Sequence, residues 1–179
     1  MNSDLEITNS IKMLREGGII VYPGETGWSL GCDLKNTEAV DAIFKSDLVE
    51  YPCILLNETG QLGKYVKELP DVVWDLVEFT SKPLQLIMND VLNIPQSILP
   101  DKEATFRIVK DTFTKNILYK FGKPVFTAVL KNQMQPEHEK TILNKPAYIV
   151  NLRSGAKLST ENLVIIKLSN GNKIEILKK

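Results

Sequence analysis

The sequence is poor in the residues that build metal centres and disulfide frameworks, because it has only two cysteines and one histidine. Cys32 and Cys53 lie in apolar surroundings, outside any Cys-x-x-Cys or zinc-ligand spacing, so we expect buried free thiols. His138 lies between Glu137 and Glu139 in a polar stretch, which favours a solvated ring over a general base. No metal site is predicted.

Two further signals are missing: an excess of one charge and a long hydrophobic run. The 22 basic residues balance 22 acidic residues, so the chain lacks the overall field of a typical nucleic-acid or membrane-surface protein. There is no signal-peptide pattern and no apolar run of the roughly 18 residues that a membrane helix needs. We therefore expect a cytoplasmic protein without a membrane partner.

The remaining composition is that of an ordinary globular protein. With 179 residues, of which 43% are hydrophobic, the chain can bury the core of one domain over residues 1–179. No internal repeat and no low-complexity tract is present.

Helical and strand patterns alternate along the chain. Helices are expected from Ser3 to the Gly17-Gly18 pair, from Asn36 or Thr37 to Lys45, at 62–66, at 72–79 and at 112–121 before Gly122. Strands are expected at 19–22, 53–56, 84–88, 106–109, 124–129 and 148–152. A terminal hairpin is expected from 163–168 and 174–177, joined by Asn170-Gly171, while 89–104 and 131–146 are interpreted as connections. This order predicts an α/β fold with a twisted, mixed parallel and antiparallel sheet and flanking helices.

One stretch, from Ile19 to Gly31, carries more polar groups than a simple turn needs. Its β-favouring residues lead into Pro23, which cannot donate a backbone hydrogen bond and is therefore interpreted as the end of a strand. Glu25, Thr26 and Trp28 follow within a few positions. Glu25 and Thr26 are candidate site residues or, alternatively, turn formers that bond their own backbone.

This stretch resembles the opening of the YrdC-like domain of threonylcarbamoyl-AMP synthases and their YciO relatives. That family reads strand, then Tyr-Pro-Thr-Asp/Glu-Thr-x-Tyr-Gly-Leu-Gly. The positions that match are Tyr22, Pro23, Glu25, Thr26, Leu30 and Gly31, and those that differ are Gly24, Trp28 and Ser29. The resemblance implies that the sheet curves around a cavity.

Further partial matches follow in the family's order. Lys45 matches the lysine of the family's Lys-x-Arg motif, whereas Asp47 stands at the arginine position. Pro83-Leu84 keeps a Pro-Leu frame, and Arg107 matches the arginine of an Arg-x-Pro strand. The family's Ser-Ala-Asn motif is replaced by Val129-Leu130-Lys131, so a hydroxyl and an amide that hold substrate in the family are missing.

The resemblance implies a reaction in which L-threonine, bicarbonate and ATP give threonylcarbamoyl-AMP and pyrophosphate. In the family, the product supplies the threonylcarbamoyl group of a modified adenosine in tRNA. Attack on the α-phosphate needs cations around the developing charge, usually including Mg²⁺ that enters with ATP. Lys45 and Arg107 are the expected catalytic cations. Lys45 could equally be a lysine that finishes a helix, and Arg107 a solvated strand residue.

The expected nucleotide and substrate contacts are Tyr22, Glu25, Thr26, Trp28 and Lys131. Trp28 is expected to form a pocket wall, with stacking on a base as the alternative.

A basic segment between residues 105 and 131 offers a second kind of surface. Lys110, Lys115, Lys120 and Lys123 occur there with Asp111 as the only acid. A solvated helix face explains such lysines, and the alternative is contact with RNA or phosphate; YrdC-like proteins are associated with double-stranded RNA.

The sequence thus supports two functions. The first is a diverged threonylcarbamoyl-AMP synthase-like protein that binds ATP or an adenylate in a cationic cavity, with weakened or altered catalysis. The second is a non-catalytic, YciO-like module for double-stranded RNA or a phosphorylated ligand.

Overall fold

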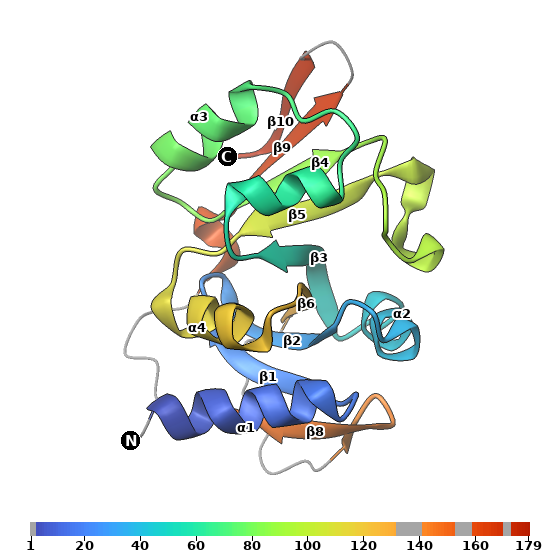
Figure 1. Ribbon diagram of the computed structural model, residues 1–179, viewed down its shortest axis with the longest axis vertical. Helices are drawn as coiled ribbons and strands as arrows, with labels where there is room; N and C mark the ends of the chain where they lie inside the picture. The colour runs from blue at the N-terminus through green and yellow to red at the C-terminus, as the bar shows by residue number, and fades with distance from the viewer. Residues whose placement is uncertain (1–2, 132–140, 153–158, 170–172) are drawn as a thin grey trace.

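The predicted strands join into one mixed, strongly twisted sheet in a computed structural model of the chain (Figure 1). The structure describes residues 3–131, 141–152, 159–169 and 173–179. His138 and the Asn170-Gly171 turn lie outside these residues, so the predictions made for them stay untested.

The α-helices are α1 (Ser3–Arg15), α2 (Thr37–Phe44), α3 (Val72–Phe79) and α4 (Thr112–Phe121). Four short 3-10 helices are η1 (Thr59–Lys64), η2 (Gln96–Ile98), η3 (Pro100–Lys102) and η4 (Thr160–Asn162). The strands are β1 (Ile19–Gly24), β2 (Gly27–Asp33), β3 (Val49–Leu56), β4 (Leu84–Met88), β5 (Ala104–Ile108), β6 (Val125–Leu130), β7 (Thr141–Ile142), β8 (Lys145–Ile149), β9 (Val164–Ser169) and β10 (Lys173–Lys178).

The sheet has the strand order β10-β9-β4-β5-β3-β6-β2-β1-β8-β7. Three neighbouring pairs, β1 with β8, β3 with β5 and β4 with β9, are parallel, and the others are antiparallel. The mixed sheet predicted from the sequence is therefore confirmed, as is the terminal β9–β10 pair.

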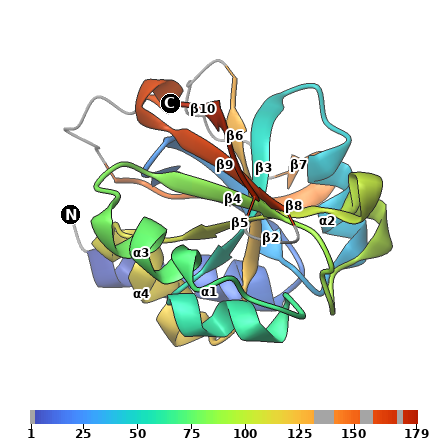
Figure 2. The same cartoon turned by 90° about the horizontal axis from the view of Figure 1, so that it is seen from above.

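Helices cover both faces of the sheet, and the sheet separates two apolar cores. The larger core joins one face of the central strands to α2, η1 and α3, through residues such as Ile43, Leu62 and Val73. The smaller core joins the other face to α1 and α4, through residues such as Leu14 and Leu118. The sheet turns so far along its length that α1, α4, η1 and α3 lie on one side of the molecule (Figure 2).

Local signals fix several of these elements. The Asn36 side chain accepts from the Ala39 N–H at the start of α2, so Asn36 is the cap of the two that were predicted. Gly122 ends α4 in the left-handed conformation, with φ 75°, as predicted. None of the helices in the described ranges is long and apolar enough to cross a membrane.

Several expectations of the sequence were wrong in detail. The strand expected at 148–152 is β8, which runs from Lys145 to Ile149. The strand does not end at Pro23, because β1 continues to Gly24 and pairs Pro23 with Trp28 of β2. The helix expected at 62–66 is instead the 3-10 helix η1, which begins and ends earlier. The connection expected at 131–146 contains β7 and the start of β8.

Candidate functional site

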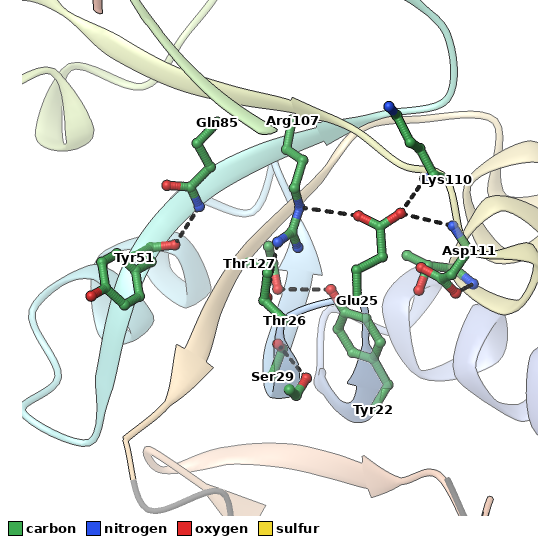
Figure 3. A network of polar contacts seen from close by, with 12 residues as sticks. Tyr22, Glu25, Thr26, Ser29, Tyr51, Gln85, Arg107, Lys110, Asp111 and Thr127 are labelled. Atoms are coloured by element: carbon green, nitrogen blue, oxygen red, sulfur yellow. Dashed lines mark hydrogen bonds and ion pairs between the residues drawn. The ribbon is translucent and has the colours of Figure 1, made fainter. Parts of the chain in front are cut away.

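The candidate site is built on the β1–β2 hairpin, whose tip consists of Glu25 and Thr26. Figure 3 shows this tip beneath β5 and beside the start of α4, more than 80 residues further along the chain. Tyr22 and Ser29 lie opposite each other in the hairpin, and both are buried. The predicted site loop is therefore a hairpin with its polar tip folded against the sheet.

Arg107 is the cation of this cluster, and it is almost completely buried, with 2% of its surface exposed. Its Nη1 donates to Thr26 Oγ1 at 2.9 Å, and its Nε lies 3.9 Å from Glu25 Oε2 (Figure 3). Burial opposes the charge of the guanidinium, but the surrounding acidic groups, first Cys53 and Tyr22 and then Glu25, outweigh burial and raise the pKa of Arg107. The side chain therefore stays cationic inside the protein.

Glu25 joins the hairpin tip to the segment between β5 and α4. Its Oε1 accepts from the backbone N–H groups of Lys110 and of Asp111, the latter at 2.8 Å. Its Oε2 and Arg107 Nε face each other without a hydrogen bond, and neither has a hydrogen-bond partner among the described residues. One buried carboxylate thus holds two backbone donors and one guanidinium.

A second buried pair lies under the hairpin. The Tyr22 hydroxyl and Thr127 Oγ1 are 2.8 Å apart, and the Thr127 hydroxyl also bonds the Leu30 carbonyl at 2.7 Å. Burial raises the pKa of the Tyr22 phenol, against the opposing effects of Arg107 and of the bond to Thr127. The phenol is therefore neutral at physiological pH.

A strained backbone position lies next to the cluster, in β3. The register of β3 against β6 shifts between Glu50 and Cys53, and Tyr51 has a φ of 50°. The Tyr51 carbonyl accepts from Nε2 of Gln85, whose side chain is buried and which pairs with Arg107 across β4 and β5. The buried amide thus holds the bulge in place.

Lys45 and Lys131, unlike Arg107, carry exposed ammonium groups. Lys45 ends α2 and lies 3.5 Å from Asp41, so the helix-end interpretation of this lysine describes its local geometry. Lys131 follows β6, and its N–H donates to the Leu48 carbonyl at 3.0 Å, which places it beside the segment between Lys45 and β3. Because Val129 pairs with Ser29, the end of β6 lies beside the start of β2.

Trp28 is partly buried and packs against the larger core. Its expected role as a pocket wall stays a prediction. Leu130 and Val129, which replace two residues of the family's Ser-Ala-Asn motif, are buried in β6 and present no polar side chain.

The lysines of the predicted basic surface have several local partners. Lys120 lies 3.8 Å from Asp4, and Lys123 lies 3.2 Å from Asp33. The Lys110 ammonium donates to the carbonyls of Val77, at 3.1 Å, and of Thr80 at the end of α3. Lys115 is exposed on α4. Acidic residues from distant segments therefore offset part of the charge that the linear sequence suggested.

Three members of the cluster were not proposed as site residues from the sequence. Gln85 and Thr127 lie within strands and Asp111 caps α4, and each has a partner 34 to 105 residues away in the chain. The one available signal was a polar residue inside an apolar strand, as with Gln85 between Leu84 and Leu86. Among the described residues, no group of three His, Cys, Asp or Glu is placed to hold a metal ion.

Comparison with known proteins gives relatives over nearly the whole chain. The sequence model of the Sua5, YciO and YrdC proteins, described as "Telomere recombination", matches residues 12–179. A threonylcarbamoyl-AMP synthase of Pseudoalteromonas translucida is 30% identical over 132 residues, which are 70% of this chain and 71% of that protein.

Solved structures show the same fold. The crystal structure of YciO from E. coli has a TM-score of 0.74 at 19% identity, covering 99% of this chain and 90% of that one. The structure of P. abyssi Sua5 complexed with L-threonine has a TM-score of 0.68 at 17% identity. There the match covers 94% of this chain but only 52% of the other, so this chain spans about half the length of that protein.

Proposed function

Because the chain belongs to the family of Sua5, YciO and YrdC proteins, we propose that it is a diverged threonylcarbamoyl-AMP synthase-like protein of the cytoplasm. In this proposal it binds ATP or an adenylate, with L-threonine as the second ligand, and serves threonylcarbamoyladenosine formation in tRNA. The observation that carries the proposal is the buried Glu25–Arg107–Thr26 cluster, which fixes the polar tip of the hairpin.

The relatives support the choice of ligands. A synthase of this name shares 30% identity with the chain, and the Sua5 structure that resembles it was determined with L-threonine. A buried ion pair that joins two distant segments costs desolvation free energy, and folding alone does not require that cost. Perturbed, charged clusters of this kind are common at functional sites.

We assign different roles to the three cations. Arg107 is 2% exposed and already bonded, so it positions Thr26 and Glu25 and contributes its positive field. Lys45 and Lys131 are exposed and supply the mobile ammonium groups for phosphate oxygens. Tyr22 supports the hairpin from below through Thr127, and Trp28 forms a wall beside it.

The Mg²⁺ that accompanies ATP would be held mainly by phosphate oxygens and water. The carboxylate at the hairpin tip, Glu25, already accepts from the backbone of Lys110 and Asp111. Held by phosphate oxygens and water, the ion would neutralise charge on the leaving pyrophosphate.

Pyrophosphate release tests the proposal. The purified protein is supplied with ATP, Mg²⁺, bicarbonate and L-threonine, and each component is omitted in turn. We expect threonine-dependent release that Lys45→Ala lowers by roughly 100-fold, the usual loss for one electrostatic contact to a transition state. The matched control Lys115→Ala, on the exposed face of α4, should change nothing.

Two outcomes would contradict this proposal in different ways. Absence of release, with ATP or AMP still raising the melting temperature, would leave a nucleotide-binding module without the chemistry. Absence of both release and stabilisation would refute the nucleotide site, and a shift produced only by double-stranded RNA would favour the RNA-binding alternative.

A further inference from the structure

A concavity lies away from the hairpin tip, at the carboxyl end of β3. This pocket has a volume of about 230 Å³. Its lining consists of Leu55, Asn57, Glu58, Gln61, Leu118, Tyr119, Gly122, Lys123 and Pro124. None of the residues proposed above for ATP or threonine lines it.

The topology explains why a pocket forms there. β3 and β5 are parallel neighbours, so their carboxyl ends meet at the same edge of the sheet. The chain leaving β3 enters η1, which packs Leu62 into the larger core, whereas the chain leaving β5 enters α4, which packs Leu118 into the smaller one. In Figure 1 the turquoise coil of η1 lies above the end of β3, and α4 lies below it. Ligands of α/β proteins bind at such points, where consecutive connections leave towards opposite faces.

The polar wall of the pocket consists of two amides. Gln61 Oε1 accepts from the backbone N–H groups of Asn57, at 2.8 Å, and of Glu58, at 3.4 Å. Its oxygen is thereby fixed on the backbone, and the NH₂ group is the part of this amide left for a ligand. Asn57 Oδ1 is buried and has no hydrogen-bond partner among the described residues. The wall therefore combines a fixed donor with an acceptor that lacks a donor.

The other walls are apolar or aromatic, apart from one acidic and one basic residue. Leu55 and Leu118 form a buried base, and Tyr119 presents a ring that is 76% exposed. Glu58 and Lys123 contribute one charge of each sign, and Lys123 is itself paired with Asp33. Such a lining disfavours a strongly charged ligand and suits a flat, neutral ring with both donors and acceptors.

We propose that this pocket binds a nucleobase, with Tyr119 stacking on the ring and the amides of Asn57 and Gln61 reading its polar edge. Asparagine and glutamine amides match the donor and acceptor pattern of a base, and tyrosine supplies a stacking surface. The volume accommodates one base, so the sugar lies at the mouth, near Lys123. The base can belong to a free nucleoside or to an unpaired position of an RNA strand.

Nuclear magnetic resonance titration of the ¹⁵N-labelled protein tests this proposal. Adenosine and uridine are the free probes, and short single strands of A or U are the second arm. We expect saturable shifts of the Gly122 amide and of the side-chain NH₂ signals of Asn57 and Gln61. Tighter, salt-dependent binding of the strands would identify RNA as the source, and equal affinity would identify free nucleosides.

Substitutions separate stacking from other effects. Tyr119→Ala should weaken binding roughly 5- to 150-fold, the range for loss of one base–aromatic stack, whereas Tyr119→Phe should keep it. Gln61→Glu retains the oxygen that caps η1 but removes the donor, and should also weaken binding. Phe79→Ala, which removes a 79% exposed ring outside the pocket, is the matched control and should have no effect.

The absence of saturable shifts would overturn the proposal. Shifts confined to Thr26 and its hairpin, unaffected by Tyr119→Ala, would do the same by placing the base at the first site. Because none of these readouts depends on pyrophosphate release, failure here is distinguishable from failure of the proposed enzymatic function.

Discussion

Replacing Glu25 with glutamine should destabilise the protein while leaving the size of the side chain unchanged. The glutamine oxygen can still accept from the N–H groups of Lys110 and Asp111. Its NH₂ group, however, would then replace the oxygen that faces Arg107 Nε–H, so a donor would oppose a donor. The buried guanidinium would keep its bond to Thr26 and lose its ion-pair partner.

The burial of both groups sets the size of the effect. The side chains of Arg107 and Glu25 are 2% and 8% exposed, so solvent screens their attraction little. Removing one partner of a buried pair costs about 3–5 kcal/mol, and the 3.9 Å separation places this pair at the lower end, near about 3 kcal/mol. For a protein of this size, that loss corresponds to a melting temperature lower by roughly 6–12 °C.

Urea unfolding of a double-mutant cycle measures this coupling. The cycle consists of Glu25→Gln, Arg107→Met and the double variant, and we expect the double variant to lose at least about 1 kcal/mol less than the sum of the single losses. Glu38→Gln is the matched control, because it breaks an exposed pair with Lys145 and should leave stability nearly unchanged. The reasoning fails if the Glu25→Gln loss is under about 1 kcal/mol, or if the two single losses simply add.

Three other outcomes follow from local contacts and can be measured by urea unfolding. Asn36→Ala should cost about 1 kcal/mol, because the Ala39 N–H loses its cap; a loss below about 0.3 kcal/mol would contradict this. Gly122→Ala should cost about 1–2 kcal/mol, because its φ of 75° strains any residue with a Cβ; an unchanged midpoint would contradict this. Burial raises the pKa of Tyr22 above its ordinary 10.0, so the folded state keeps a proton that the unfolded state releases. The contribution of Tyr22 to the free energy of unfolding is therefore fully present below pH about 10. Above that pH it falls by up to about 1.4 kcal/mol per pH unit, and Tyr22→Phe should make this fall less steep. Equal slopes for both proteins would contradict it.

Elements fixed by neighbouring residues could be predicted from the sequence. The predicted bounds of α4 and β4 agree with the structure, because Gly122 ends the helix and apolar residues mark the strand. The cap of α2 was limited to two adjacent residues for the same reason. These signals act within a few residues, so composition and spacing are sufficient to reveal them.

The hairpin shows where this reasoning fails. Pro23 indicated a strand end because it lacks an N–H, yet β8 pairs with β1 only along Ile19–Val21. Beyond that point one side of β1 has no neighbouring strand among the described residues, so a missing donor costs nothing there. The sequence alone could not reveal the end of that pairing, because β8 lies more than 100 residues further along the chain.

The polar cluster was only partly predictable for a similar reason. Glu25, Thr26 and Arg107 were identified through the family resemblance, but their mutual contacts depend on the twist that carries the hairpin tip to β5. Thr127 and Gln85 are single polar residues within otherwise apolar strands. Only the register of the sheet shows which of them face the hairpin.

The two free cysteines divide between the two cores, since Cys32 belongs to the larger and Cys53 to the smaller. Burial raises the pKa of both thiols, so the folded chain shields them from alkylation in two ways. Each thiol can be modified only when its own side of the sheet opens. In single-cysteine variants pulsed with a thiol reagent, the modification rate would therefore report how often each face of the sheet opens. Unequal rates would show that the two layers do not open as one cooperative unit.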